Sequence, residues 1–97
     1  MTSWTLMAGD LTLGRLSLRE VDQPFFFCQF TPSVDFAQVA PVFARDAAAI
    51  EGHDQVAQED AGEAMDELGL RLVHESDGSI IEELLIHVSG NEAWFRY

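Results

Sequence analysis

The most constraining stretch of the chain is an uncharged aromatic run at residues 25–30, Phe-Phe-Phe-Cys-Gln-Phe, which directly follows Pro24. A strand that is covered on both faces loses the regular alternation of polar and apolar side chains, as this run does. The run is too short to cross a bilayer. It therefore predicts a central strand of an antiparallel sheet, buried on both of its faces.

The length and composition of the chain predict a single globular domain spanning residues 1–97. The chain has 97 residues, of which 47% are hydrophobic, and a domain of this size buries roughly 60–65% of the surface that its unfolded chain exposes. Cys28 is the single cysteine, so no intramolecular disulfide can form, which favours a reducing compartment and a cytoplasmic location. No basic segment precedes an apolar stretch at the N-terminus, so we expect no signal peptide.

The charge balance is the most unusual feature of the composition. The chain carries 17 acidic residues and five basic ones, all of them Arg, for a formal charge of −12. Such a surface repels phosphate groups and anionic lipid, so we expect no direct binding to nucleic acid or membrane. It remains compatible with a basic protein partner, although solubility is the simpler explanation of excess carboxylate.

Two further strands are expected before the aromatic run. Residues 4–7 form the first, and Gly9 lies in the turn that follows. Leucines then alternate with other residues, but their phase changes by one residue after Gly14. A phase slip at a strand glycine predicts a β-bulge. A second tight turn at Gly14 is the alternative.

Two helices are expected between residues 36 and 68. The first spans residues 36–50, with an irregular turn before Pro41, because a proline inside a helix removes a hydrogen bond. Gly52 can end this helix as its C′ residue, and Asp54 can cap the second, which stops at Gly69. Apolar residues at helical spacing form one stripe on each helix: Phe36, Val39, Ala40, Phe43, Ala47 and Ile50 on the first, and Ala57, Ala61, Ala64, Met65 and Leu68 on the second.

The predicted helical segment also holds most of the negative charge. Nine acidic residues and one basic residue, Arg45, occupy residues 35–68, so this segment carries −8 of the total −12. The opposite face of the second helix gathers five of these acids: Glu59, Asp60, Glu63, Asp66 and Glu67.

Three strands are expected after the helices, at residues 70–75, 80–88 and 92–97. A three-residue loop at residues 76–78 would keep Leu72 on the core face. A two-residue turn at Gly90-Asn91 would place His87 opposite Trp94 and Leu85 opposite Arg96. The resulting order is β-β-β-α-α-β-β-β, which predicts an α+β two-layer sandwich with a mostly antiparallel sheet and both helices packed on one face.

Three groups of residues could carry chemistry, and each has a simpler structural explanation. The pair His53-Asp54 is similar to a metal-binding pair of certain phosphohydrolases, but such a site needs further His and Asp ligands from other helices, so a turn that caps a helix is the favoured explanation. Glu59 and Glu63 are four residues apart on one helix face and could hold a divalent cation. No histidine joins them at helical spacing, so a solvated helix face is the simpler explanation. Cys28 lies in an apolar strand that offers no base partner, so we expect a buried structural thiol. We therefore expect no catalytic, cofactor or metal site.

The outer face of the last two strands is the candidate partner surface. In the register given above, five side chains share this face: Ile81, Leu85, His87, Trp94 and Arg96. An exposed Trp and Leu beside Arg is typical of a protein contact. The alternative is a monomer in which the Trp packs under neighbouring Arg and His side chains. The final strand can also be a sheet edge, which invites pairing with a second chain.

These features leave three functional hypotheses. The first is a non-catalytic protein-interaction module, self-associating as a homodimer through the outer sheet face or an edge strand. The second is an acidic inhibitor or immunity-type protein that binds a basic partner through its helical layer. The third is a small enzyme, which would require His53, His74, His87 and several acids to converge in space.

Overall fold

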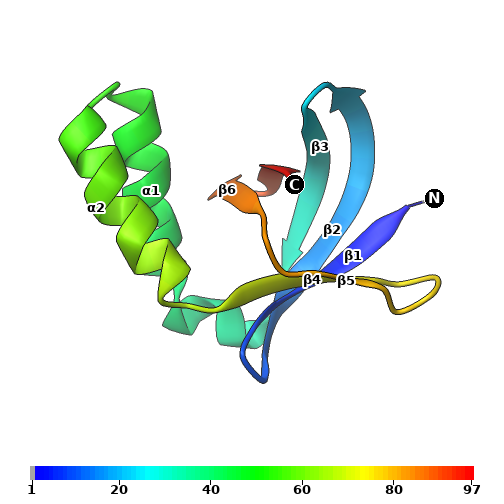
Figure 1. The fold of residues 1–97 in the computed structure, drawn as a ribbon. Coiled ribbons are helices and arrows are strands. Elements are labelled where there is room, and N and C mark those ends of the chain that lie inside the picture. The colour runs from blue at the N-terminus through cyan, green and yellow to red at the C-terminus, as the bar shows by residue number, and fades with distance from the viewer. Residues whose placement is uncertain (1) are drawn as a thin grey trace.

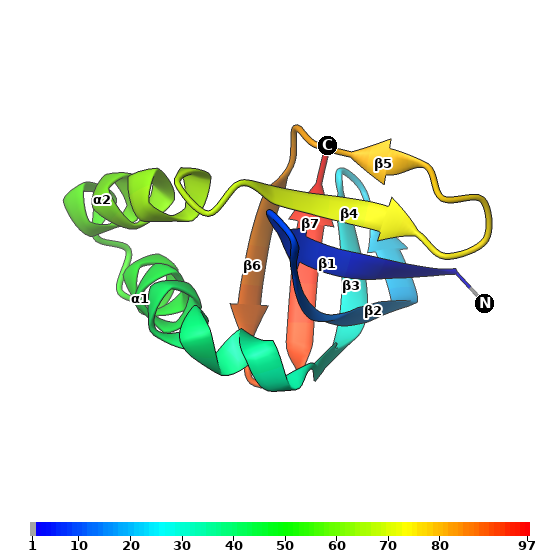
Figure 2. The same ribbon diagram turned by 90° about the horizontal axis from the view of Figure 1, so that it is seen from below.

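Seven antiparallel strands form one strongly curled sheet in residues 2–97, the part of the chain that the computed structural model describes. The strands follow the order β5-β4-β1-β2-β3-β7-β6 across the sheet, and β1 and β4 cross β6 and β7 at a steep angle because of the curl (Figure 2). Their bounds are β1 Ser3–Ala8, β2 Leu11–Asp22, β3 Phe25–Pro32, β4 Leu70–His74, β5 Ile80–Ile81, β6 Leu85–Ser89 and β7 Glu92–Arg96.

The aromatic run is a central strand, as predicted, because β3 lies between β2 and β7. The prediction that both faces of the run are buried is wrong. Cys28 and Phe30 are buried, but Gln29 is exposed and Phe25 and Phe27 are only half-buried. One face of β3 therefore belongs to the core, while the other looks outward from the curled sheet.

The predicted β-bulge at Gly14 is confirmed. Strand β2 continues through Gly14, and β1 pairs Leu6 with Gly14 but Met7 with Thr12, which leaves Leu13 as the extra residue. Leu13 and Leu16 are both buried in consequence. The extra residue thus explains the phase slip of the leucines and adds local twist to the sheet.

The helical region has the expected irregular start. A 3-10 helix, η1, spans Val34–Gln38 and precedes α1, Ala40–Glu51, while α2 spans Gln55–Asp66. The carboxylate of Asp54 caps α2 by accepting a hydrogen bond from the backbone N–H of Ala57 at 3.1 Å. The predicted role of Gly52 is wrong, because its φ is −78° and the left-handed conformation belongs to His53, with φ 54°.

Both helices lie together beside strand β6 and give the α+β fold that the sequence predicts (Figure 1). Helix α1 packs on α2 and on β6. Each helix contributes a large side chain to the core, Phe43 from α1 and Met65 from α2. Among residues 2–97, no helix is long and apolar enough to span a bilayer.

The predicted strand at residues 80–88 is divided into two. Its first part, β5, pairs with β4 at one edge of the sheet, and its second part, β6, pairs with β7 at the other edge. Residues 82–84 connect the two edges, which the curl brings close enough for so short a link. Strand β7 consequently lies inside the sheet, so the suggestion that the final strand forms an edge is wrong.

The loop between β4 and β5 is also longer than predicted. Val73 pairs with Ile80, and the backbone N–H of His74 donates to the carbonyl of Ser79 at 2.8 Å. Four residues, 75–78, therefore form the loop instead of three. Leu72 still reaches the core, because its partner is Ile81 and no longer Glu82 or Glu83. The β6–β7 register matches the prediction at His87 and Trp94 and at Leu85 and Arg96.

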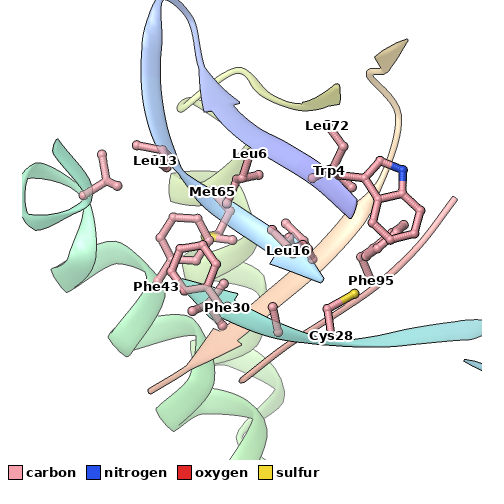
Figure 3. Close-up of a cluster of buried hydrophobic side chains, with 14 residues drawn as sticks. Trp4, Leu6, Leu13, Leu16, Cys28, Phe30, Phe43, Met65, Leu72 and Phe95 are labelled. Atoms are coloured by element: carbon pink, nitrogen blue, oxygen red, sulfur yellow. The ribbon is translucent and has the colours of Figure 1, made fainter. Parts of the chain in front are cut away.

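The hydrophobic core fills the inside of the curl (Figure 3). The ring of Phe95 stacks on Phe26 at a centroid distance of 5.2 Å and meets Trp4 edge-on at 5.0 Å. Such aromatic pairs stabilise a core by about 0.5–1.5 kcal/mol beyond their buried area. The largest fully buried side chains are Phe30, Phe43, Phe95, Leu6, Leu13, Leu16 and Leu72.

Replacement of Gly14 tests the close packing at the bulge. A Cβ atom at this position would lie 2.6 Å from the Phe30 ring and 2.6 Å from the Thr31 carbonyl oxygen. We expect Gly14→Ala to lower the free energy of unfolding by about 2 kcal/mol, as overpacking does. In contrast, Gly62→Ala on α2 meets open space and should raise it by up to about 1 kcal/mol. Urea denaturation of both variants measures the difference, and equal effects would contradict the packing at Gly14.

Candidate functional site

Strands β3, β7 and β6 bring a group of aromatic and apolar side chains together on the outer face of the sheet. Phe27 pairs with Trp94 across β3 and β7, and Trp94 pairs with His87 across β7 and β6. Residues that face each other in an antiparallel pair point to the same side. We call this group the outer-face patch; its members are Phe25, Phe27, Leu85, His87, Trp94 and Arg96.

Short contacts connect the members of the outer-face patch. The ring centroids of Phe25 and Phe27 are 6.4 Å apart, and those of His87 and Trp94 are 5.6 Å apart. The guanidinium carbon of Arg96 lies 5.9 Å from the centre of the Phe25 ring, within the range of a cation–π interaction. Neighbouring side chains thus restrict the positions of these rings.

The patch stays partly open to solvent. Leu85 is 44% exposed, and Phe25, Phe27 and Trp94 are half-buried. Phe27 and Trp94 also border a surface hollow of about 370 Å³. A contiguous, half-exposed aromatic face of this kind is a candidate contact surface.

Four of the five predicted surface residues meet in the patch, and one does not. Ile81 lies on β5 at the opposite edge of the sheet and packs against the core. Conversely, the sequence reasoning missed Phe25 and Phe27, which it assigned to a strand buried on both faces. The available signal was Gln29, since alternate positions of a strand share a face and this face carries a polar residue.

The outward residues of β7 follow a regular chemical order. Glu92, Trp94 and Arg96 alternate with the buried residues Ala93 and Phe95. The row along the strand is thus an acid, an indole and a base, with the indole in the middle.

His87 of the patch is hydrogen-bonded to a buried carboxylate of helix α1. Asp46 of α1 is only 5% exposed, and its Oδ2 lies 2.6 Å from Nδ1 of His87. With a proton on Nδ1, the imidazole donates this hydrogen bond to the carboxylate and ties α1 to β6. The sequence reasoning did not single out Asp46, although it follows Phe43 by three residues and therefore lies on the same side of the helix.

The remaining histidines do not gather around a common centre. His53 lies in the exposed turn between the helices, and His74 lies at the end of β4, where its Nδ1 is 2.9 Å from the Ser76 hydroxyl. Within residues 2–97, no three His, Cys, Asp or Glu side chains are placed to hold a metal ion. Glu59 and Glu63 are both exposed to solvent on α2.

Cys28 is a buried thiol, as predicted from its apolar strand. Burial disfavours the charged thiolate and raises the pKa of Cys28 from 9.0 to about 11. The sulfur is therefore protonated at neutral pH, and it lies on the inner face of β3, opposite the outer-face patch.

Comparisons of this chain with protein-family models, with curated proteins and with solved structures each find no match.

Removal of the Asp46 carboxylate tests how strongly it supports the patch. We expect Asp46→Ala to lower the free energy of unfolding by about 1–3 kcal/mol, because His87 then loses its hydrogen-bond partner in a poorly solvated place. Asp60→Ala, at an exposed position of α2, should change it by less than about 0.5 kcal/mol. Urea denaturation gives both values. The double variant with His87→Ala should lose less than the sum of the two single variants; strict additivity would contradict the coupling.

Proposed function

We propose that this protein is a small non-catalytic interaction module that self-associates as a homodimer through the outer-face patch. The observation that carries the proposal is the outward row of β7, in which Trp94 lies between Glu92 and Arg96. A two-fold axis that passes beside Trp94, parallel to the sheet face and perpendicular to β7, places Glu92 of each copy opposite Arg96 of the other. The row is therefore complementary to itself, which is the requirement for a two-fold symmetric interface.

The composition of the patch supports the same conclusion. Trp and Arg are the residue types most enriched at the energetic centres of protein interfaces, and aromatic residues are enriched at their cores. Here Trp94 is central, Phe27 and His87 flank it on both neighbouring strands, and Arg96 lies toward one end. Rings that are already held by their neighbours lose less conformational freedom when a partner binds.

The sheet edges are less suited to self-association than this face. The edge strand β6 lies against α1, which occupies the side where another strand would pair. The other edge strand, β5, has only two residues, Ile80–Ile81. Natural sheets often protect their edges by short strands and by covering helices.

We further propose that the protein binds neither nucleic acid nor membranes and that it is located in the cytoplasm. A charge of −12 disfavours direct contacts with nucleic acid or with anionic membranes. A single cysteine, which is buried and protonated at neutral pH, suits the reducing conditions of the cytoplasm.

Charge exchange on β7 tests the proposed dimer. We expect the wild-type chain to dimerise in sedimentation-velocity runs between about 1 and 200 µM. The single variants Arg96→Glu and Glu92→Arg should each weaken the dimer about tenfold or more, because each places like charges opposite one another. The double variant Glu92→Arg with Arg96→Glu restores both pairs and should recover most of the association. Runs at about 0.15 M salt, where the Debye length is about 8 Å, limit the repulsion between the acidic helices.

The control for these variants is Arg45→Glu, which makes the same charge change at an exposed position of α1. It should leave the dimer within about twofold of the wild type. Trp94→Ala should abolish association, with circular dichroism as the check on folding. A wild-type chain that stays monomeric at 200 µM would overturn the proposal, and so would equal effects of Arg96→Glu and Arg45→Glu.

A second candidate function is supported by the acidic surface of α2. Glu59, Asp60, Glu63, Asp66 and Glu67 are all exposed, and no basic residue lies within the helix. Such a surface attracts a basic protein and speeds the encounter with it. An inhibitor of a basic protein would use this layer while leaving the outer-face patch free.

Salt dependence tests this second function. A basic partner captured from a cell extract at 50 mM salt should be released at 500 mM, because exposed charges are screened as the Debye length falls. Capture should also fail for a variant in which Glu59, Asp60 and Glu63 are replaced by Gln, Asn and Gln. If the triple variant retains the same proteins as the wild type, the acidic surface is not the binding site.

A further inference from the structure

A cleft opens between the helical layer and the sheet, beside β6. It has a volume of about 290 Å³, and residues of α1, α2, β4, the link at residues 82–84 and β6 line it. Three carboxylates border it, Asp46, Asp66 and Glu82, and no Lys or Arg is among the described residues that line it. Its apolar wall includes Met65, Leu70 and Leu84.

One of these carboxylates is buried and only half satisfied. Asp46 is 5% exposed, and its Oδ2 is taken by His87. Its Oδ1 accepts no hydrogen bond from the described residues. Within residues 2–97, every fully buried side-chain oxygen or nitrogen has a hydrogen-bond partner. Because Oδ1 has none, it must be reached by solvent. Asp46 lines the cleft, which is the open space next to this carboxylate. A carboxylate that is mostly buried and hydrogen-bonded through one oxygen only is incompletely hydrated, and a cationic guest in the cleft would give its second oxygen a charge-assisted hydrogen bond.

The spacing of the carboxylates argues against a metal ion as the guest. Within the part of the chain that the structure describes, no three acidic, His or Cys side chains converge closely enough to hold one. Carboxylates that border a cleft without converging suit a larger cation, whose hydrogen-bond donors are spread over several atoms. A guanidinium group offers five N–H donors in a planar fork, and an ammonium group offers three.

We propose that this cleft binds an organic cation, a guanidinium or primary ammonium group on a short aliphatic stem. The head group donates hydrogen bonds to Oδ1 of Asp46 and to the carboxylates of Asp66 and Glu82 at the rim. The stem lies on the apolar wall of Met65, Leu70 and Leu84. A volume of about 290 Å³ is just below the usual range for ligand pockets, which suits one small group of this kind.

The same chemistry can come from a free small molecule or from an Arg side chain of a partner protein. Agmatine, a guanidinium on a four-carbon stem with a terminal amine, represents the first source. A blocked arginine dipeptide represents the second, because its backbone must remain outside the cleft. Butylurea has a similar size and no charge, so it separates charge recognition from filling of the apolar wall.

Titration of the ¹⁵N-labelled protein with agmatine tests the proposal. We expect chemical-shift changes centred on the amides of Gly62, Gly69 and Leu85, which line the cleft, and no comparable change with butylurea. Glu82→Gln should weaken agmatine binding about fivefold or more, since a charge-assisted hydrogen bond is lost at a partly solvated rim. Binding of the dipeptide with similar affinity would assign the site to a protein side chain, and binding of agmatine alone would assign it to a small molecule.

The matched control is Glu59→Gln, which removes one exposed charge from α2 at a position that does not line the cleft. It should change the affinity by less than twofold. Glu82 is itself exposed, so its variant should fold, and circular dichroism verifies this. Equal weakening by Glu82→Gln and Glu59→Gln would show nonspecific attraction to an acidic protein and overturn the proposal, as would the absence of shift changes with both cations.

Discussion

The close contact between Phe30 and Gly14 packs β3 tightly against the bulge of β2. The Phe30 ring occupies the place that a Cβ atom of residue 14 would fill, and this is possible only because β2 carries a glycine beside its extra residue, Leu13. Strand β2 has a second register shift between Leu18 and Glu20. Such irregularities add twist to a sheet, and in this curled sheet the two edges are joined by residues 82–84. The positions of the other elements follow from that curl. The inner faces of the strands make a core around Phe30 and Phe95, and the outer faces turn away from it, so β3 has one apolar face inside and another that meets solvent.

Strand β6 has three different environments because it ends the curl beside the helices. Its inner residues, Ile86 and Val88, are buried in the core, and its outer residue His87 belongs to the aromatic face. Its free edge lies beside α1 (Figure 2), and a helix next to a sheet edge hinders the pairing of another strand. The hydrogen bond between Asp46 and His87 fixes this arrangement, since it connects the helix to the outer side of the strand. A buried carboxylate at this position is costly without a partner, and the imidazole compensates for part of that cost.

The elements that depend on local chemistry could be predicted from the sequence, and those that depend on the curl could not. Pro41, Asp54 and the phase slip at Gly14 act through their own neighbours, so the irregular helix start, the cap and the bulge were all found. The register of Trp94 and His87 follows from a two-residue turn and was found as well. The division of residues 80–88 depends on the distance between the sheet edges, which no local pattern encodes. Because the curl could not be predicted, Ile81 was assigned to the outer sheet face, although it packs against the core. For the same reason Phe25 and Phe27 were missing from the predicted partner surface.

The aromatic face and the acidic cleft are neighbours, and two residues connect them. Leu85 lines the cleft and also contributes to the outer face, while Asp46 borders the cleft and holds His87 beside Trp94. A cation at Oδ1 of Asp46 would draw electron density from the carboxylate and weaken its acceptance of the His87 hydrogen bond through Oδ2. Loss of Asp46 itself would therefore disturb both surfaces at once and could not separate their roles. Arg96 and Glu82 can do so, because each is exposed, each belongs to one surface only, and neither takes part in the hydrogen bond between α1 and β6.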